Sequence, residues 1–398
     1  MRCHVAISKE ADVVQAVERL YESTIHSSGE KSPDLSFLFF SSFFSEETSS
    51  LQALIHEEIS PKMLIGCMNN GVIGGTEEFE AQPAIVLWSA WLPDVTMLPI
   101  RLTAQEYDGR LSLEGWPGSL KTQDHQPYLF LFADPFTTPI DEVFTLMEQD
   151  CPGTPVIGGI ASGGTDSGEN RLMLNQDMYD SGVVGVAVWG RIEVRTVVSQ
   201  GCQPIGEPYV VTKANRNIVY ELGGESMLDR LKTTMQNLRD SNNSQISQSI
   251  QVGLVMNEYR DQFGRGDFLI RDLMGADEKS GGVAISDMVQ EGQTLQFHIR
   301  DAMVADEELK KLLGNDKSLN GERPPHGVLL FSCNCRGERF FAQPHHDIRT
   351  VHDQLGLVPV AGFFAGGEIG PVGGKNFLHG YTASVALFCD PQEEVTSA

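Results

Sequence analysis

Two polar clusters near the C-terminal end of the chain contain the residues best suited to chemistry. Residues 331–337 (FSCNCRG) follow an apolar run and supply the thiols of Cys333 and Cys335, an amide and the guanidinium of Arg336. About thirty residues later, residues 359–371 (PVAGFFAGGEIGP) form a second apolar run that ends in glycines and in the carboxylate of Glu368. Two strands that end at one sheet edge would bring both clusters together. We therefore expect a ligand pocket there, although neither cluster is a catalytic motif.

Arg336 and Glu368 each lie in apolar, glycine-rich sequence, where an unpaired charge would be costly. One interpretation is that they form an ion pair with each other. The other is that they hold the two charged ends of a small zwitterion, with Arg336 bidentate to a carboxylate and Glu368 bound to an amine. The sequence leaves both open.

Glycines gather at the ends of apolar runs throughout the chain. Such loops can present backbone N–H groups to a carboxylate or phosphate, or they can simply allow tight turns and close packing. No nucleotide-binding fingerprint is present, because residues 163–168 (GGTDSG) lack the lysine of a phosphate-binding loop. The residues that we expect to bind a ligand are Asn69, Gly158, Gly159, Ser162, Cys333, Asn334, Arg336, Gly362, Phe363, Gly367 and Glu368.

The same residues were considered for catalysis and for metal binding, and we assign none to either role. Ser162 is flanked by glycine but lacks the G-x-S-x-G context of a hydrolase nucleophile, so an enzyme that uses Ser162 or Cys333 is an alternative hypothesis. Cys333 and Cys335 could join His345, His346 and Asp347 as metal ligands, but no second cysteine pair completes a structural zinc site. We expect a binding protein rather than an enzyme, with no metal.

The composition limits the partners and the compartment. The chain has 398 residues, 41% of them hydrophobic, and 54 acidic against 29 basic residues give a formal net charge of -25. This charge repels phosphate backbones and anionic lipid headgroups, so we expect no nucleic acid partner and no membrane insertion. The seven cysteines and the absence of a signal-peptide pattern predict a reduced, cytoplasmic protein.

One pattern occurs three times: an apolar strand, a short amphipathic helix, a glycine-bearing strand, a connection and another apolar strand. The first strands of the three copies are expected at 35–40, 128–132 and 328–332. In the second copy, Thr138 is predicted to cap the helix over 139–150; in the third, Gly356 is predicted to end the helix over 346–355. The strands are apolar throughout, which indicates burial on both faces.

These patterns predict a mixed α/β fold, with two similar halves of layered mixed sheets covered by helices. Residues 252–300 depart from the repeat, and their short strands indicate an antiparallel meander. The sequence leaves open whether the copies share one system of sheets or form separate domains.

Residues 333–337 and the run 361–371 resemble the FIST family, and weaker similarity extends over most of the chain. The resemblance implies a FIST N-type sensory domain over residues 1–200 and a FIST C-type domain over residues 201–398. It also implies a stand-alone sensor that binds a small polar metabolite, proposed for the family to be an amino acid or derivative, and signals to a partner protein. Some relatives are thought to be haem-binding nitric oxide sensors, which would give His345, His346, His352 and His379 a role with haem; otherwise no cofactor is expected.

Overall fold

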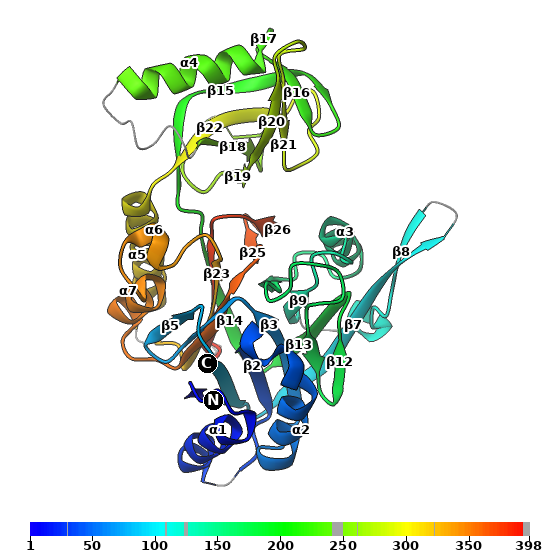
Figure 1. The fold of residues 1–398 in the computed structure, drawn as a ribbon, viewed down its shortest axis with the longest axis vertical. Helices are drawn as coiled ribbons and strands as arrows, with labels where there is room; N and C mark the ends of the chain where they lie inside the picture. The colour runs from blue at the N-terminus through cyan, green and yellow to red at the C-terminus, as the bar shows by residue number, and fades with distance from the viewer. Residues whose placement is uncertain are drawn as a thin grey trace, which may run out of the picture. The chain divides into compact units, whose positions relative to one another are not determined.

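The computed structural model of the protein describes residues 1–29, 31–107, 110–122, 126–240, 250–260, 262–321 and 323–392. The chain divides into two compact units. The first contains residues 1–198, 310–378 and the C-terminal segment from 382; the second contains residues 199–309 and 379–381. Both combine strands with helices, so the mixed α/β class predicted from the sequence is confirmed (Figure 1). The assignment of domains to residues 1–200 and 201–398 stays a prediction.

All three copies of the repeat lie in the first unit. The first copy, with two preceding elements, consists of β1 (Arg2–Ser8), α1 (Val13–Ser28), β2 (Leu35–Ser41), η1 (Ser42–Glu47), α2 (Thr48–Glu58), β3 (Met63–Asn69), β4 (Gly71–Gly74), β5 (Glu77–Glu80) and β6 (Ile85–Trp91). The second consists of β7 (Val95–Tyr107), β8 (Arg110–Glu114), η2 (Gly118–Thr122), β9 (Tyr128–Ala133), α3 (Ile140–Asp150), β10 (Val156–Ile160), β11 (Leu172–Leu174), β12 (Asp177–Tyr179) and β13 (Val183–Gly190). The third consists of β14 (Glu193–Ser199), β23 (Gly327–Cys333), α6 (Glu338–Phe341), α7 (His346–Leu355), β24 (Val360–Ala365), β25 (Glu368–Val372), β26 (Lys375–His379) and β27 (Ala383–Cys389).

Each copy pairs its two main strands in parallel: β2 with β3, β9 with β10, and β23 with β24. The hairpin that follows the second strand does not stay in its own sheet. The β4–β5 hairpin of the first copy pairs with β24, β11–β12 of the second pairs with β3, and β25–β26 of the third pairs with β10. The exchange is cyclic, so the three copies form one shared system of sheets.

The inner faces of the three sheets pack on one core because side chains alternate along each buried strand. Phe39 of β2, Phe132 of β9 and Phe331 of β23 occupy equivalent positions. Their ring centroids lie 5.4, 5.8 and 6.2 Å apart, so the three rings form a triangle. The outer faces are also buried: α1 and α2 cover the first sheet and α3 covers the second (Figure 1). Burial on both faces explains why these strands are continuously apolar.

Of the two helix ends predicted from the sequence, the end of α7 at Gly356 is confirmed and the cap of α3 at Thr138 is not. Gly356 follows α7 with a φ of 84°, a conformation that favours glycine, as predicted. The predicted cap at Thr138 is wrong. Its hydroxyl instead donates a hydrogen bond to the Gly182 carbonyl oxygen at 3.0 Å, and Pro139 occupies the N-cap position of α3. The hydroxyl thus joins the helix entry to the start of β13.

The second unit has one antiparallel sheet of its own, in the order β19-β18-β22-β15-β16-β21-β20. The short antiparallel strands predicted over 252–300 are present, but the predicted meander is wrong: among these strands only β18–β19 and β20–β21 are consecutive neighbours, and β22 pairs with β18 and β15. The elements of the second unit are β15 (Cys202–Asn215), β16 (Ile218–Leu222), β17 (Glu225–Ser226), α4 (Met227–Asp240), β18 (Ile250–Val255), β19 (Phe268–Arg271), β20 (Leu273–Asp277), β21 (Gly282–Ile285) and β22 (Thr294–Arg300). The chain returns to the first unit within α5 (Ala302–Asn320).

Three equivalent glycines allow the parallel strands to approach each other closely. A Cβ atom added to Gly66, Gly158 or Gly362 would lie 2.1, 1.9 or 1.7 Å from the carbonyl oxygen of the leucine on the neighbouring strand. Backbone atoms cannot move aside as the end of a flexible side chain can. The glycines at 158 and 362 are therefore explained by packing inside the sheets.

We expect Gly362→Ala to destabilise the first unit by about 1–3 kcal/mol or more, because the new methyl group overlaps the Leu330 carbonyl oxygen. Gly118→Ala is the matched control, since nothing lies within 4 Å of its added Cβ. Urea unfolding midpoints compare the two variants with the original chain. Equal midpoints for all three would show that the strand spacing does not depend on this glycine.

Candidate functional site

The carboxyl ends of the parallel strands meet, as the sequence analysis expected for a ligand site. Ser162, just after β10, joins all three copies at this point. Its hydroxyl donates to the Phe364 carbonyl oxygen at 2.5 Å and accepts from the Asn70 N–H at 3.1 Å. Its own N–H donates to Asn69 Oδ1 at 3.4 Å. These bonds use the Ser162 hydroxyl to join strand ends, which argues against a nucleophile at this position.

Several residues predicted to bind a ligand lie inside the structure instead. Phe363 is fully buried, with its ring 5.1 Å from that of Phe39. A Cβ on Gly159 would meet Ala365 Cβ at 3.0 Å, and one on Gly367 would meet the Leu378 side chain at 2.9 Å. These three positions are accounted for by packing at the strand ends.

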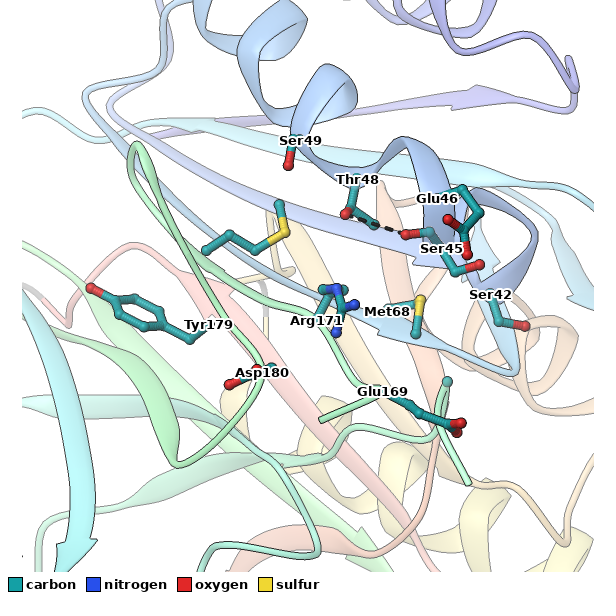
Figure 2. A pocket seen from close by; sticks show the side chains of 12 residues that line it. Ser42, Ser45, Glu46, Thr48, Ser49, Met68, Glu169, Arg171, Tyr179 and Asp180 are labelled. Atoms are coloured by element: carbon teal, nitrogen blue, oxygen red, sulfur yellow. Dashed lines mark hydrogen bonds between the residues drawn. The ribbon is translucent and has the colours of Figure 1, made fainter. Parts of the chain in front are cut away.

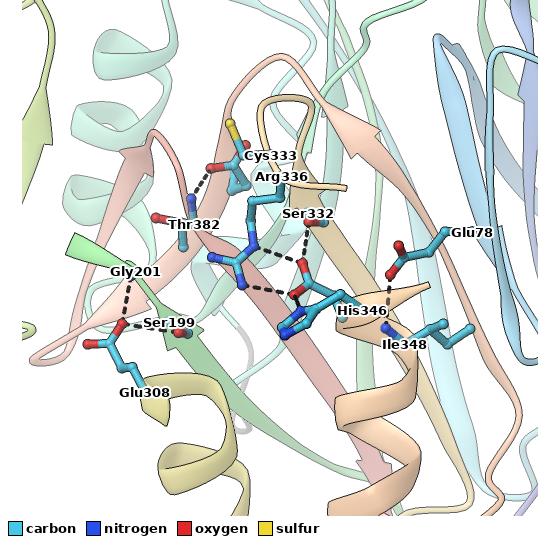
Figure 3. A network of polar contacts seen from close by, with 12 residues as sticks. Glu78, Ser199, Gly201, Glu308, Ser332, Cys333, Arg336, His346, Ile348 and Thr382 are labelled. Atoms are coloured by element: carbon cyan, nitrogen blue, oxygen red, sulfur yellow. Dashed lines mark hydrogen bonds and ion pairs between the residues drawn. The ribbon is translucent and has the colours of Figure 1, made fainter. Parts of the chain in front are cut away.

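Arg336 is held by a buried carboxylate from its own copy. Its Nε and Nη2 donate to the two oxygens of Asp347 at 2.8 and 2.9 Å (Figure 3). Asp347 also accepts from the Ser332 hydroxyl at 2.7 Å, and His346 Nδ1 lies 2.9 Å from its other oxygen. Both members of the pair are about 2% exposed or less. The fork of the guanidinium is thus directed at Asp347 rather than at an open cavity.

The charges of this pair stabilise each other. Burial alone would lower the pKa of Arg336, but the Asp347 carboxylate outweighs it and the pKa is raised. Burial alone would raise the pKa of Asp347, but the Arg336 guanidinium, helped by His346, holds it well below its usual range. Both groups therefore stay ionised near neutral pH. This geometry supports a structural ion pair for Arg336, with Asp347 as its partner.

Glu368 is the second buried carboxyl group of the predicted site. Its Oε2 accepts from the Thr382 N–H at 3.0 Å, while Oε1 has no hydrogen-bond partner among the described residues. Burial raises the pKa of Glu368 well above its usual range, although Thr382, the Cys333 thiol and Arg336 act in the opposite direction. Burial therefore favours the neutral form of Glu368. The zwitterion hypothesis required the anionic form, which this environment disfavours.

Glu78 is a third buried carboxyl group, and the sequence analysis missed it. It lies on β5, and its Oε1 accepts from the Ile348 N–H at 3.0 Å, in the first turn of α7. The Glu78 N–H donates to His345 Nδ1 at 2.9 Å. Burial, followed by the nearby Asp347 carboxylate, raises the pKa of Glu78 to about 8, against the lowering effect of the Ile348 N–H. The exchanged hairpin is thus attached to the third copy through a titratable group.

A cavity of about 720 Å³ lies at the carboxyl end of β2 and β3. It is lined by Ser42, Ser45, Glu46, Thr48, Ser49, Met68, Gly163, Glu169, Arg171, Met178, Tyr179 and Asp180. Figure 2 shows Arg171 between the segment that carries Ser45 and Glu46 and the segment that carries Asp180. The lining combines hydroxyl groups, three carboxylates and one guanidinium, so it suits a small polar ligand.

Arg171 is the guanidinium of this cavity. Its Nη1 donates to the carbonyl oxygens of Gly168 and Asn170 at 2.6 and 2.8 Å, which fixes the side chain in the loop before β11. Among the described residues, its Nε and Nη2 groups have no hydrogen-bond acceptor. Glu169, beside it, accepts from the N–H groups of Thr165 and Asp166 and from the Thr165 hydroxyl. Arg171 was not among the residues predicted from the sequence, because neither its spacing nor its neighbours form a motif.

A second cavity, of about 500 Å³, adjoins the first and shares Ser42 with it. Its lining consists of Ser42, Phe43, Asn70, Gly71, Glu80, Ala81, Asn334 and Phe364. Asn334 is the predicted ligand-binding residue that the structure places in a cavity wall. Asn69 and Ser162 lie directly behind that wall through their bonds to each other and to Asn70.

The histidines that the resemblance connected with haem make other contacts. His346 stacks on Phe341 with the ring centroids 3.4 Å apart, and His352 Nε2 lies 3.1 Å from the Val358 carbonyl oxygen. Haem needs an axial ligand that faces an apolar slot, whereas both cavities above are polar and lined by no histidine. The described residues thus do not fit haem in these cavities. They also contain no group of three or more His, Cys, Asp or Glu side chains arranged for a metal ion.

Comparison with protein families finds two matches that together cover most of the chain. The FIST N domain matches residues 34–225, and the FIST C domain matches residues 228–371. Among the helices of the described residues, none is long and apolar enough to cross a membrane.

Relatives of similar length occur in mycobacteria. The uncharacterized protein Rv0628c of Mycobacterium tuberculosis is 39% identical over 393 residues, covering 98% of this chain and 100% of the relative. The uncharacterized protein Mb0898c of Mycobacterium bovis is 38% identical over 394 residues, covering 99% of this chain and 100% of the relative. The alignments thus span both matched domains.

Replacing Arg336 should destabilise the fold. Arg336→Met leaves the buried Asp347 carboxylate without its guanidinium, which we expect to cost about 3–5 kcal/mol in urea unfolding. The double variant Arg336→Met/Asp347→Asn removes both charges and should recover part of that loss. A loss below about 1 kcal/mol for the single variant would contradict a structural role for the pair.

The raised pKa of Glu78 predicts that stability depends on pH. In the unfolded chain this carboxyl titrates near 4.5 and in the folded chain near 8, so between these values only the folded state keeps the proton. The contribution of Glu78 to stability therefore falls as pH rises from about 4.5 to 8. Glu78→Gln, which stays neutral, should lose less stability than the original chain over this window, by on the order of 3 kcal/mol.

Unfolding of both proteins in urea at about pH 5 and pH 8 measures this difference. Glu57→Gln, which changes an exposed carboxyl group on α2, is the matched control and should follow the original chain. Parallel pH profiles for Glu78→Gln and the original chain would show that Glu78 ionises as freely in the folded state as in the unfolded state.

Proposed function

Because the chain belongs to the FIST family, whose domains are sensory, ligand-binding modules of signal transduction proteins, we propose that it senses a small polar metabolite that carries an amine. The ligand class is an amino acid or a derivative of one. The binding site is the cavity around Arg171, extended by the adjoining cavity around Asn334. The observation that carries this proposal is a guanidinium fixed among carboxylates and hydroxyl groups in a cavity large enough for such a ligand.

The position of the cavity supports a binding role. In sheets with parallel strands, ligands bind outside the carboxyl ends of those strands, where loops from neighbouring elements can surround them. Ser42 follows β2 and Met68 lies near the end of β3, so the first cavity occupies this position for one parallel pair. Gly163 follows β10 and contributes a wall from the second copy.

The donors of Arg171 suit a carboxylate. Two carbonyl oxygens hold its Nη1 and so orient the planar group, while Nε and Nη2 form the edge that can donate two parallel bonds. Orientation before binding reduces the entropy lost when a ligand is bound. Arg171 therefore replaces Arg336 as the expected anchor of the ligand's carboxylate.

The other charges around the cavity suit an amine. Glu46, Glu169 and Asp180 outnumber Arg171, and the whole chain carries a formal charge of -25. Glu169 is already engaged by backbone N–H groups, so Glu46 and Asp180 are the better partners for an ammonium group. The negative potential also favours cationic and zwitterionic ligands over dicarboxylates.

The second cavity extends the site toward the predicted residues. Its wall carries the amides of Asn70 and Asn334, the Glu80 carboxylate and the ring of Phe43. An amino acid whose α-groups lie near Arg171 could place its side chain there. In this proposal Asn334 selects among side chains, while Cys333 and Glu368 line neither of the two cavities.

We place this sensor in the cytoplasm and expect its occupancy to be read by a partner protein. The seven cysteines are all free thiols, which fits a reducing compartment. The partner is expected from the role of the family in signal transduction.

Calorimetric titration of the protein with individual amino acids tests the proposal, with succinate as the dicarboxylate control. Arg171→Ala should weaken the best ligand by roughly 1.5–3 kcal/mol, about ten-fold to more than a hundred-fold, because a charge-assisted bidentate contact is lost. Glu46→Gln should weaken ligands through their amine. Arg191→Ala is the matched control, since Arg191 is exposed and lines neither cavity.

Thermal melting confirms that Arg171→Ala still folds, because Arg171 also bonds two loop carbonyls. Flat titrations of folded protein with every amino acid and amine would contradict the proposed function. Binding that Arg171→Ala leaves unchanged would place the ligand elsewhere. A Soret band after incubation with haem, or turnover that depends on Ser162 or Cys333, would instead favour the gas-sensor or enzyme alternative.

A further inference from the structure

The turn that follows β23 carries two thiols whose surroundings differ. Cys333 is the last residue of β23 and is buried, whereas Cys335 is exposed to solvent. The Arg336 N–H donates to the Cys333 carbonyl oxygen at 2.8 Å, so residues 333–336 form a closed turn. The two thiol groups lie in hydrogen-bonding contact across this turn. From this geometry, we propose that Cys333 and Cys335 form a reversible disulfide in response to hydroperoxides, on either side of the Asn334 residue that lines the second cavity.

The surrounding residues hold the turn in place. The Arg336 side chain is fixed by the bidentate pair with Asp347, and the Cys333 N–H donates to the Thr382 carbonyl oxygen at 2.9 Å. The Asn334 N–H donates to the Ala365 carbonyl oxygen at 2.9 Å. A disulfide forms without large backbone movement only where the two Cα atoms are already close. The bonds of Cys333, Asn334 and Arg336 hold this turn closed, and the two cysteines are separated by one residue within it.

The chemistry assigns a different role to each cysteine. The contact with Cys335, followed by burial, raises the pKa of Cys333, so Cys333 keeps its proton near neutral pH. Its thiol donates to Asn334 Oδ1 at 3.9 Å. The exposed Cys335 is the one that a peroxide can reach, and the buried Cys333 is the one positioned to resolve the product. Glu368 lies against Cys333, and its charge acts in the same direction by raising the pKa of Cys333 further.

The reaction balances with hydrogen peroxide as the oxidant. The Cys335 sulfur attacks one peroxide oxygen; the O–O bond breaks, a sulfenic acid forms and one water leaves with the thiol proton. The Cys333 sulfur then attacks the Cys335 sulfur; the S–S bond forms, the S–O bond breaks and the hydroxide leaves as water with the Cys333 proton. Two thiols and one hydrogen peroxide thus give one disulfide and two waters, and a dithiol reductant reverses the change.

Mass spectrometry of the full chain can test this directly. Trypsin should release residues 318–336 as one peptide, because Lys317 and Arg336 end it and Arg323 is followed by Pro324. This peptide contains Cys333 and Cys335 and no other cysteine. The protein is reduced, desalted, treated with a small molar excess of hydrogen peroxide, denatured and alkylated with iodoacetamide before digestion.

We expect the peptide to appear two hydrogen masses lighter and unalkylated, and to take up two alkyl groups once dithiothreitol is added. In Cys335→Ser the buried Cys333 should stay reduced and be alkylated. In Cys333→Ser the remaining Cys335 should proceed to sulfinic acid, because nothing resolves its sulfenic acid. The peptides that carry the buried Cys67 and Cys202 should stay reduced in every sample.

Two results would overturn the proposal. The first is a peptide whose two thiols both remain available to iodoacetamide after peroxide treatment. The second is a peptide in which Cys335 becomes sulfinic acid, or joins a second molecule, while Cys333 stays reduced in the original chain. Because Cys335 is exposed, Cys335→Ser should fold, so the comparison with this variant holds even where Cys333→Ser does not.

Discussion

The contact among Phe39, Phe132 and Phe331 is the constraint on which the rest of the first unit depends. Three rings with centroids 5.4 to 6.2 Å apart require three sheets to approach one axis, and each sheet gains its last two strands from a neighbouring copy. The interior is filled by these rings and by glycine-spaced strands. The two cavities that we assign to a ligand lie outside this interior, at strand ends where loops from different copies meet.

Two arginines illustrate how surroundings, rather than residue type, decide a role. Arg336 lies in the interior, where a guanidinium is stable only with a full set of partners, and Asp347 supplies them. Arg171 lies in a cavity wall, where two carbonyl oxygens orient it and its other donors face a polar space. Burial has a comparable effect on carboxyl groups: it raises the pKa of Glu78 and Glu368 and so favours their neutral forms, while Glu46 lines an open cavity. Only the charged groups in a cavity wall, such as Arg171 and Glu46, are available to a ligand.

The sequence predicted the elements that local pattern determines. Apolar runs located β2, β9 and β23, and the glycine at 356 located the end of α7, because burial on both faces and backbone conformation leave a local signature. The exchange of hairpins leaves no local signature in the sequence, since a strand's partner can lie hundreds of residues away. Asp347 was not recognised as the partner of Arg336, although only 11 residues separate them, because their contact depends on how the turn after β23 and the start of α7 pack together. Arg171 was overlooked because a cavity is formed by segments that are distant in sequence.

The proposed ligand site joins two copies. Ser42, Glu46 and Met68 belong to the first copy, whereas Arg171 and Asp180 flank the β11–β12 hairpin that the second copy contributes to the first sheet. A ligand whose carboxylate binds Arg171 and whose amine binds Glu46 would connect these two segments. Its binding energy would then stabilise the exchanged hairpin selectively, because a ligand favours the state in which all its contacts are present. In such an arrangement the junction between copies, rather than the aromatic core, is the part of the fold that can respond to occupancy.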